Sequence, residues 1–264
     1  MLEIMNSVAV ITGGASGIGK ALAIHWISNG GKVVLGDISF DELQRTKEEL
    51  QEKGGDVAIT ACDVTKEKDN HHLAKFAAEQ FGAINLIAPC AGITKDGFML
   101  STDRDTGKVV KKMSLEQFQS VIDVNLTGTF LTIRECAEQM IELSCMGLIC
   151  LFSSIGSLGT AGQINYSSTK AAMSVMPKVI TAEFARRNLG HRIRCIAIAP
   201  GYVATPMVAA MAPNVLNELL QQVPIKRLIY PEEVVSLIAE LYRNEAISGE
   251  IFHINGGLRL GSMS

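Results

Sequence analysis

The sequence predicts an α/β protein with a doubly wound, seven-stranded parallel sheet and helices on both faces. Short apolar runs alternate with longer segments of helical period along all 264 residues. Most of the short runs are apolar on both faces, as expected of a parallel sheet that helices cover on each side. The repeated strand–helix order implies right-handed crossovers. We therefore expect a single domain over residues 1–264.

Seven apolar runs justify the strands. In chain order they are "SVAVIT" (7–12), "KVVLGD" (32–37), "VAITAC" (57–62), "INLIAP" (84–89), "GLICLFSS" (147–154), "RIRCIAIAP" (192–200) and "EIFHING" (250–256). Helical patterns fill the gaps at 17–29, 39–53, 66–81, 114–143, 164–188 and 231–243. The stretch 94–113 differs, because "FMLS" and "KVVKK" flank the polar turn "TDRDTG". This pattern predicts an exposed hairpin.

Composition and charge narrow the function classes. The net charge of −3 and the scattered basic residues give no electrostatic footprint for nucleic acid. The six cysteines form no CxxC pair, which indicates reduced thiols and a cytoplasmic protein. Apolar runs stay well short of the roughly 20 residues that span a bilayer, so we expect no membrane association. His71 and His72 are adjacent on a predicted helix and diverge by about 100°, and we expect no metal site.

The first chemical motif, "TGGASGIG", places Gly13, Gly17 and Gly19 between the first strand and a helix. Glycines let the backbone approach an anion closely, and the helix N-terminus offers N–H groups to a pyrophosphate. This arrangement is typical of a Rossmann-type dinucleotide site, although its GxxxGxG spacing differs from GxGxxG. Asp37 ends the next strand, where an acid binds a ribose 2′-OH and repels a 2′-phosphate. Together with Ser16, where a basic side chain would otherwise stand, it favours NAD(H), with NADP(H) as the alternative.

The second motif, "YSSTK", places Tyr166 and Lys170 one turn apart on a predicted helix. A nearby cation lowers a tyrosine pKa and makes the phenol a usable general acid–base near neutral pH. A serine at the end of the fifth strand would meet the cofactor crevice and hold a carbonyl oxygen beside the tyrosine. Ser153 and Ser154 both stand there, and they point to opposite sides of an extended strand.

These motifs, in this order, resemble those of the short-chain dehydrogenase/reductase family over essentially the whole chain. The matching segments are "TGGASGIG" (12–19), "CDV" (62–64), "AG" (91–92), "DVNLTG" (123–128), "SS" (153–154), "YSSTK" (166–170) and "PGYVAT" (200–205). Within the family, "AGITKDG", "DVNLTGTF" and "GQINYSSTKAA" look most similar to 3-oxoacyl-thioester reductases of the acyl-carrier-protein type.

The resemblance implies a catalytic tetrad. Tyr166 would act as general acid–base, and Lys170 would lower its pKa and bind the nicotinamide ribose. Asn125 would hold a water that continues the proton relay. The family's catalytic serine stands thirteen residues before the tyrosine, which selects Ser153. The implied cofactor-binding positions are Gly13, Ser16, Gly17, Ile18, Gly19, Asp37, Ile38, Asp63, Val64, Cys90, Ala91, Gly92, Tyr166, Lys170, Pro200, Gly201, Val203 and Thr205.

Two features depart from the family pattern. The family usually has Asn-Asn-Ala-Gly after the fourth strand, whereas this chain has Pro89 and Cys90 in place of the asparagines that help tie adjacent strands. Pro89 lacks an N–H donor, which predicts that the strand ends there. The 94–113 hairpin is longer than in most relatives, and we expect it near the substrate mouth or at a subunit contact. By analogy, segment 206–221, which Pro213 breaks, is expected to form a mobile lid over the substrate.

The predicted function is that of an NAD(H)-dependent oxidoreductase that interconverts a secondary alcohol and a ketone. The substrate that the resemblance implies is a 3-oxoacyl thioester of acyl-carrier protein or CoA. Two alternatives stay open: a dehydrogenase of small secondary alcohols, diols or hydroxysteroids, and a non-catalytic NAD-sensing interaction protein on the same fold. The family also implies a homotetramer, or else a dimer, built through 114–143, 164–188 and the last strand.

Overall fold

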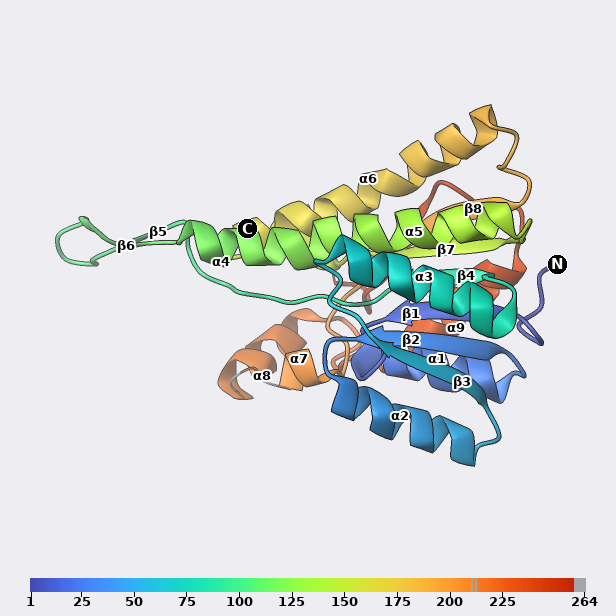
Figure 1. The fold of residues 1–264 in the computed structure, drawn as a ribbon. Coiled ribbons are helices and arrows are strands. Elements are labelled where there is room, and N and C mark those ends of the chain that lie inside the picture. The colour runs from blue at the N-terminus through green and yellow to red at the C-terminus, as the bar shows by residue number, and fades with distance from the viewer. Residues whose placement is uncertain (210, 212, 259–264) are drawn as a thin grey trace.

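Seven parallel strands form one sheet in the order β3-β2-β1-β4-β7-β8-β9 (Figure 1). The computed structural model describes residues 1–209, 211 and 213–258. The strands of the sheet are β1 (Val8–Thr12), β2 (Lys32–Asp37), β3 (Asp56–Ala61), β4 (Leu86–Pro89), β7 (Gly147–Phe152), β8 (Ile193–Pro200) and β9 (Ile251–Ile254). The predicted doubly wound, Rossmann-type class is therefore confirmed.

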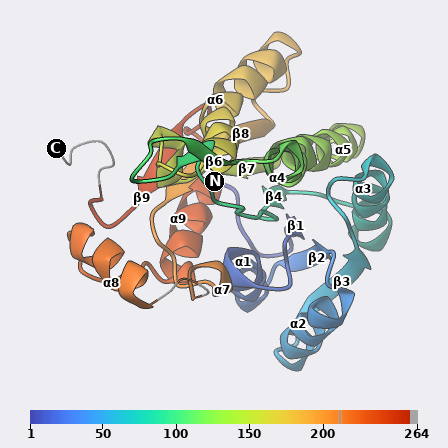
Figure 2. The ribbon, with the colours of Figure 1, turned by 90° about the vertical axis from the view of Figure 1, so that its left-hand side faces the viewer.

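Helices cover both faces of this sheet (Figures 1 and 2). They are α1 (Gly17–Ser28), α2 (Phe40–Glu52), α3 (Glu67–Phe81), α4 (Leu115–Ile122), α5 (Thr129–Glu142), α6 (Ile164–Arg186), α7 (Pro206–Ala209), α8 (Pro213–Gln222) and α9 (Pro231–Arg243). One face packs against α1, α2 and α9, and the other packs against α3, α5 and α6. None of the helices in the described ranges is both long enough and apolar enough to cross a membrane.

Successive side chains along a strand belong alternately to two separate core clusters. On β1, Ala9 and Ile11 join the cluster around Trp26 of α1. Val8 and Val10, which point the other way, join the cluster that contains Leu73 of α3. Because both faces of the sheet are buried, the strands lack the polar alternation of a half-solvated sheet.

The strand order changes direction at β1. The chain runs from β1 outward to β2 and β3, and then places β4 on the other side of β1. Ala9 accordingly pairs with Val33 on one side and with Leu86 on the other. Doubly wound sheets bind ligands beyond the carboxyl ends of the strands at such a switch point. The crevice of this protein lies there, between the ends of β1, β2, β4 and β7.

The predicted helix 114–143 is continuous, but its geometry changes in the middle. Ser114 caps α4, because its Oγ accepts a hydrogen bond from the Gln117 N–H at 3.0 Å. The segment Asp123–Gly128 is a π-helix, and α5 then resumes the α-helical geometry. A π-helix accommodates an extra residue in a turn and is frequent at functional sites. The polar residues that interrupt the apolar pattern, Asp123 and Asn125, lie in this π-helical segment.

An arm extends from the body beside the start of α4 (Figure 1). It consists of the antiparallel strands β5 (Leu100–Thr102) and β6 (Val109–Lys112) within the predicted 94–113 hairpin. The arm and the α7–α8 segment extend to the same side of the molecule. Residues 210 and 212 of the proposed lid lie outside the described part of the chain.

Candidate active site

The glycine-rich turn between β1 and α1 forms one wall of the crevice. Gly13 and Gly17 adopt positive φ angles of 67° and 54°, in the left-handed region that favours glycine. A Cβ on Gly13 would lie 2.8 Å from the Ala91 nitrogen, and one on Gly19 would lie 2.3 Å from the Gly13 oxygen. The turn therefore requires glycine, and it leaves room for an anion at the N-terminus of α1.

Asp37 stands at the end of β2 beside this turn. Its Oδ2 accepts a hydrogen bond from the Ala15 N–H at 3.1 Å, and its Oδ1 accepts one from the Ser39 N–H at 3.0 Å. Two main-chain donors thus hold the carboxylate at the rim of the crevice. The next residue, Ile38, is 74% exposed and also lines the crevice. A fixed carboxylate beside an exposed apolar side chain suits a ribose hydroxyl and the flat base attached to it.

The residues that follow β3 and β4 also line the crevice. Asp63 Oδ1 accepts hydrogen bonds from the Thr65 N–H at 3.0 Å and the Thr65 hydroxyl at 2.7 Å. Its carboxylate is thus directed towards its own loop. Val64 packs so closely on the π-helical segment that a Cβ on Gly128 would lie 2.7 Å from Val64 Cγ2. β4 ends at Pro89, as the sequence predicts.

Cys90 follows Pro89 and keeps the strands tied through its backbone. Its N–H donates to the Thr12 carbonyl at 3.1 Å. Burial raises the pKa of its thiol well above the usual value, and Cys150 adds to this shift. A thiol that stays protonated is a poor nucleophile, so Cys90 acts as a wall residue. Thr12, opposite Pro89 in the register, has a buried hydroxyl that finds no hydrogen-bond partner among the described residues.

Tyr166, Lys170 and Ser154 meet beyond the carboxyl end of β7. Lys170 Nζ lies 5.5 Å from the centre of the Tyr166 ring and donates to the Phe152 carbonyl at 2.8 Å. Ser154 opens the 3-10 turn Ile155–Leu158, and its Oγ accepts a hydrogen bond from the Gly156 N–H at 3.1 Å. A Cβ on Gly156 would lie 3.3 Å from the Tyr166 ring and 3.4 Å from Ser154 Oγ. The glycine therefore lets the phenol and the serine hydroxyl approach each other.

Both serines line the crevice, but their hydrogen bonds favour Ser154 over the predicted Ser153. Ser153 is 4% exposed, and its Oγ donates to the Lys170 main-chain oxygen at 2.8 Å and lies 2.9 Å from Ser174 Oγ. Its hydroxyl is thus occupied inside the junction between β7 and α6. The hydroxyl that acts on Tyr166 belongs to Ser154, which lowers the pKa of the phenol by hydrogen bonding. Ser154 is therefore the serine that is placed to contact a substrate oxygen beside Tyr166.

The pKa of Tyr166 is shifted upwards, opposite to the prediction. Burial raises the pKa of Tyr166, the Ser154 hydroxyl lowers it, and the Asp96 carboxylate raises it again. Burial also lowers the pKa of Lys170 to about 8. Near pH 7 the lysine is still mostly protonated, and the phenol keeps its proton. This state suits a general acid that protonates an oxygen.

The side chain of Asn125 binds the loop after β4, and its predicted role of holding a relay water stays a prediction. Its Oδ1 accepts a hydrogen bond from the Ile93 N–H at 2.8 Å, and its Nδ2 donates to the Ile93 carbonyl at 2.9 Å. The side chain is 1% exposed, and both of its polar groups bind the loop after β4. Its main-chain oxygen accepts a hydrogen bond from Thr129 Oγ1 at 2.8 Å. Asn125 therefore positions the crevice wall at Ile93.

The predicted site residues leave out several polar residues of the crevice, among them Asp96, Gln163 and Tyr202. Gln163 Nε2 donates to Asp96 Oδ2 at 2.8 Å, which holds the carboxylate near Tyr166. Burial raises the pKa of Tyr202, and Asp96 raises it further. The available signal was a lone acid in the loop that follows β4, since such loops lie at the ligand-binding edge of the sheet.

The crevice as a whole has a volume of about 490 Å³, within the usual range of ligand sites. Every predicted cofactor-binding position lines it, from the glycine turn to Thr205. On the substrate side, the methionines Met207 and Met211 join the wall. The topology thus brings together residues from the ends of separate strands, which is the normal way that this architecture builds a site.

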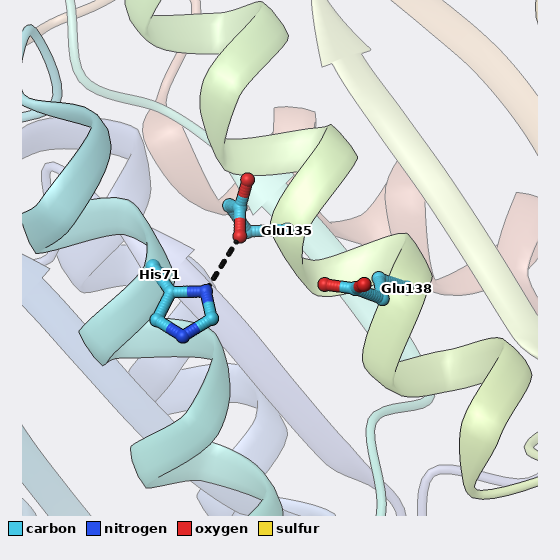
Figure 3. A group of neighbouring side chains, drawn as sticks. All are labelled: His71, Glu135 and Glu138. Carbon is cyan, nitrogen blue, oxygen red and sulfur yellow. Dashed lines mark hydrogen bonds and ion pairs between the residues drawn. The ribbon is translucent and has the colours of Figure 1, made fainter.

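A separate group of potential metal ligands lies on α3 and α5 (Figure 3). His71 Nδ1 lies 2.9 Å from Glu135 Oε2, with Glu138 nearby. Arg134 donates to the other Glu135 oxygen at 2.6 Å and also binds Glu67. Because Arg134 already neutralises the Glu135 carboxylate, we assign this group to holding the two helices together.

Comparison with known proteins agrees with this geometry. Residues 7–215 match the short chain dehydrogenase family. A 3-oxoacyl-(acyl-carrier-protein) reductase FabG of Staphylococcus epidermidis is 30% identical over 257 residues, covering 96% of this chain and 99% of the relative. A 3-hydroxyacyl-CoA dehydrogenase type-2 of Drosophila melanogaster is 34% identical over 264 residues, covering 97% and 99%.

A solved structure shares the fold. It is that of a 3-ketoacyl-(acyl-carrier-protein) reductase from Brucella melitensis complexed with NADH, with a TM-score of 0.81 at 23% identity. The similarity covers 97% of this chain and 99% of that one. Together with the glycine turn and the Tyr166–Lys170 pair, these matches show that the chain belongs to the short-chain dehydrogenase/reductase family.

Proposed function

We propose that this oxidoreductase uses NAD(H) to interconvert a secondary alcohol and a ketone, and that its substrate is a 3-oxoacyl thioester. The observation that carries the proposal is the meeting of Tyr166, Ser154 and Lys170 beside the glycine turn. The phenol, the hydroxyl and the cation are the groups needed to protonate and hold a carbonyl oxygen.

Tyr166, Ser154 and Lys170 each have a separate role in the proposed reduction of the ketone. Tyr166 donates its phenolic proton to the carbonyl oxygen, since its raised pKa keeps it protonated. Ser154 donates a hydrogen bond to the same oxygen, and Lys170 stabilises the phenolate that remains, from 5.5 Å above the ring centre. A nicotinamide cofactor, when bound, supplies the hydride. In alcohol oxidation, Tyr166 takes the proton back.

Asp37 supports NAD(H) over NADP(H). The carboxylate is fixed by the Ala15 and Ser39 N–H groups, and it would repel a 2′-phosphate. Ser16, which directly precedes α1, offers no positive charge to such a phosphate. NADP(H) is therefore the second choice.

The thioester assignment rests on the relatives, which act on 3-oxoacyl groups of a carrier protein or on 3-hydroxyacyl-CoA by name. The crevice extends past Tyr166 to an apolar wall at Met207 and Met211, where an acyl chain would fit. The first alternative is a dehydrogenase of small alcohols or diols, since a 2,5-dichloro-2,5-cyclohexadiene-1,4-diol dehydrogenase of Sphingobium indicum is 31% identical.

Self-association of the protein is part of the proposal. An apolar groove lies between α5 and α6, and it includes the exposed side chains of Phe130, Val175 and Val179. Exposed apolar patches of this kind mark interaction sites. We propose a homotetramer, or else a dimer, which sedimentation velocity would reveal. The six free thiols support a cytoplasmic location.

Replacing the tyrosine tests the proposed function. The Tyr166→Phe variant should lose 3-oxobutanoyl thioester reduction by about two orders of magnitude or more, followed as NADH absorbance, while NADH binding persists. Tyr230→Phe is the matched control, because Tyr230 is exposed at the start of α9. Retained turnover in Tyr166→Phe would contradict the assigned role. Tight NADH binding without turnover of any thioester, ketone or alcohol would favour the non-catalytic alternative.

A further inference from the structure

The β5–β6 arm begins directly after residues that line the crevice. Thr94 and Asp96 line the crevice, and the chain leaves it at Gly97 to build the arm. The Gly97 N–H donates to the Gly162 carbonyl at 2.7 Å. Gly162 lies just before α6, four residues from Tyr166 in the sequence. The root of the arm is thus fixed to the segment that carries the proposed catalytic tyrosine.

Side-chain amides reinforce this root. Gln117 of α4 donates to the carbonyls of Lys95 and Asp96 at 3.0 and 3.1 Å. Asn165 of α6 donates to the Lys95 carbonyl at 2.9 Å and is fully buried. Two helices therefore hold residues 95–97 in place while the rest of the arm extends away from the body (Figure 1). A molecule bound to the arm would lie beside the crevice entrance.

The arm exposes more apolar surface than a hairpin in solution normally does. Its large apolar side chains are all about half exposed or more: Phe98, Met99, Leu100, Val109 and Val110. A two-stranded hairpin has no core of its own and is at best marginally stable in water. A concentrated apolar surface on such an element indicates a partner that covers it.

The arm is also basic in an acidic chain. Residues 94–113 hold five basic and three acidic side chains, whereas the whole chain has a net charge of −3. Lys111 and Lys112 are exposed on β6 opposite Ser101 and Leu100. Among the acids, Asp103 is directed into the tip of the arm, where it accepts hydrogen bonds from the Thr106 N–H and hydroxyl at 2.8 Å. The outward charge is therefore mainly that of the lysines.

We propose that the arm docks an acidic carrier protein that presents the acyl thioester on a flexible prosthetic group. This inference rests on the proposed function, because it assumes a thioester substrate. Charge complementarity selects the partner: lysines surrounded by apolar side chains fit an acidic protein surface with an apolar centre. From a carrier docked on the arm, the prosthetic group would pass Asp96 and Gln163 on its way to Tyr166.

Charge reversal on the arm tests the proposal. The Lys111→Glu/Lys112→Glu variant should raise the KM for a carrier-bound 3-oxoacyl thioester by about tenfold, with kcat unchanged. The KM for the same acyl group on N-acetylcysteamine should stay the same, because that substrate has no protein to dock. Added salt should raise the wild-type KM for the carrier substrate and affect the variant less.

Lys68→Glu/Lys75→Glu is the matched control, since it makes the same change of charge at exposed lysines of α3. An equal KM increase in this control would overturn the docking site, because it would show an effect of net charge. An equal increase for the CoA thioester would also overturn it, since the arm would then recognise phosphate. A change in sedimentation coefficient with unchanged KM would identify the arm as a subunit contact instead.

The failure of the docking proposal is separable from that of the proposed function. Turnover of the N-acetylcysteamine thioester with no KM change for the carrier substrate would overturn docking alone. If no thioester is turned over, the proposed function fails, and fluorescence anisotropy of a labelled acidic carrier protein still tests docking. Binding that the Lys111→Glu/Lys112→Glu variant loses supports the arm, and binding that it retains overturns it.

Discussion

The hydroxyl of Ser153 donates to the main-chain oxygen of Lys170 at 2.8 Å, and this bond joins the end of β7 to α6. The two elements that carry Ser154 and Tyr166 are thereby fixed relative to each other. Adjacent serines consequently have different tasks, because the hydroxyl of Ser153 is bound within the junction and that of Ser154 acts on Tyr166. Substitution of each serine separates these tasks.

Ser154→Ala should lower kcat for ketone reduction by about 10²–10³-fold, the usual loss when one oxyanion donor is removed. Ser153→Ala should keep kcat within a few-fold of the wild type, but it should lower the free energy of unfolding by about 1–2 kcal/mol. Steady-state kinetics and chemical denaturation measure the two effects. The opposite ranking, with Ser153→Ala inactive and Ser154→Ala active, would show that Ser153 is the catalytic serine.

Asp37→Ala should improve the use of NADPH, because it removes a carboxylate that repels the 2′-phosphate. We expect the ratio of kcat/KM for NADPH to that for NADH to rise by about tenfold or more. Asp41→Ala serves as the control, since Asp41 is exposed in the first turn of α2 and does not line the crevice. A wild-type protein that already prefers NADPH would contradict the assigned role of Asp37.

Asp96→Asn should move the pH profile of alcohol oxidation to lower pH. Oxidation needs the deprotonated phenol, so kcat/KM rises as the pH approaches the pKa of Tyr166. The Asp96 carboxylate raises that pKa, and removing its charge lowers it, while the asparagine oxygen can still accept the Gln163 hydrogen bond. Asp105→Asn, at the exposed tip of the arm, should leave the profile unchanged. A shift to higher pH in Asp96→Asn would exclude this electrostatic role.

Thr12→Val should stabilise the protein. The Thr12 hydroxyl is buried and lacks a hydrogen-bond partner in the described part of the chain, so its replacement by a methyl group removes a desolvation cost. We expect a gain of about 1 kcal/mol, or about 2–4 °C in Tm. Thr132→Val should do the reverse, because the equally buried Thr132 hydroxyl donates to Asn70 Oδ1 at 2.7 Å. Destabilisation by both substitutions would indicate that Thr12 has a partner.

Much of the fold could be predicted because most of the strands are apolar on both faces, and this pattern separates a parallel sheet from a half-solvated one. The glycine turn could also be predicted from the sequence. Gly13 has a positive φ angle, and neighbouring atoms approach both Gly13 and Gly19 so closely that a side chain would not fit. Most of the cofactor positions came from the family resemblance, and they lie at the edge of the sheet where this architecture binds ligands.

The family spacing selects Ser153 whereas the structure favours Ser154, because counting residues from Tyr166 does not say which side of the sheet a side chain faces. On β7, Ile149 and Leu151 point to the face that α6 covers, and the period of two along a strand puts Ser153 on that face as well. Ser154 points the other way. The alternation of side chains along β7 therefore distinguishes the two serines better than the spacing does, once the face covered by α6 is known.

The pKa of Tyr166 could not be derived from the sequence either. Spacing placed Lys170 one helical turn away, but burial, which raises the pKa most, depends on the surrounding fold. Asp96 adds its charge from a loop that is seventy residues distant along the chain. Contacts of this range become visible only when the strands have been placed side by side.

The π-helical segment Asp123–Gly128 also determines how α4 is rotated about the helix axis relative to α5. Each residue of an α-helix advances the chain by about 100°. Deleting one residue here would restore regular α-helical winding and rotate α4 by about that angle relative to α5. Gln117 would then turn away from Lys95 and Asp96, whose carbonyls it now holds. The winding of this segment thus decides whether α4 can hold the root of the arm.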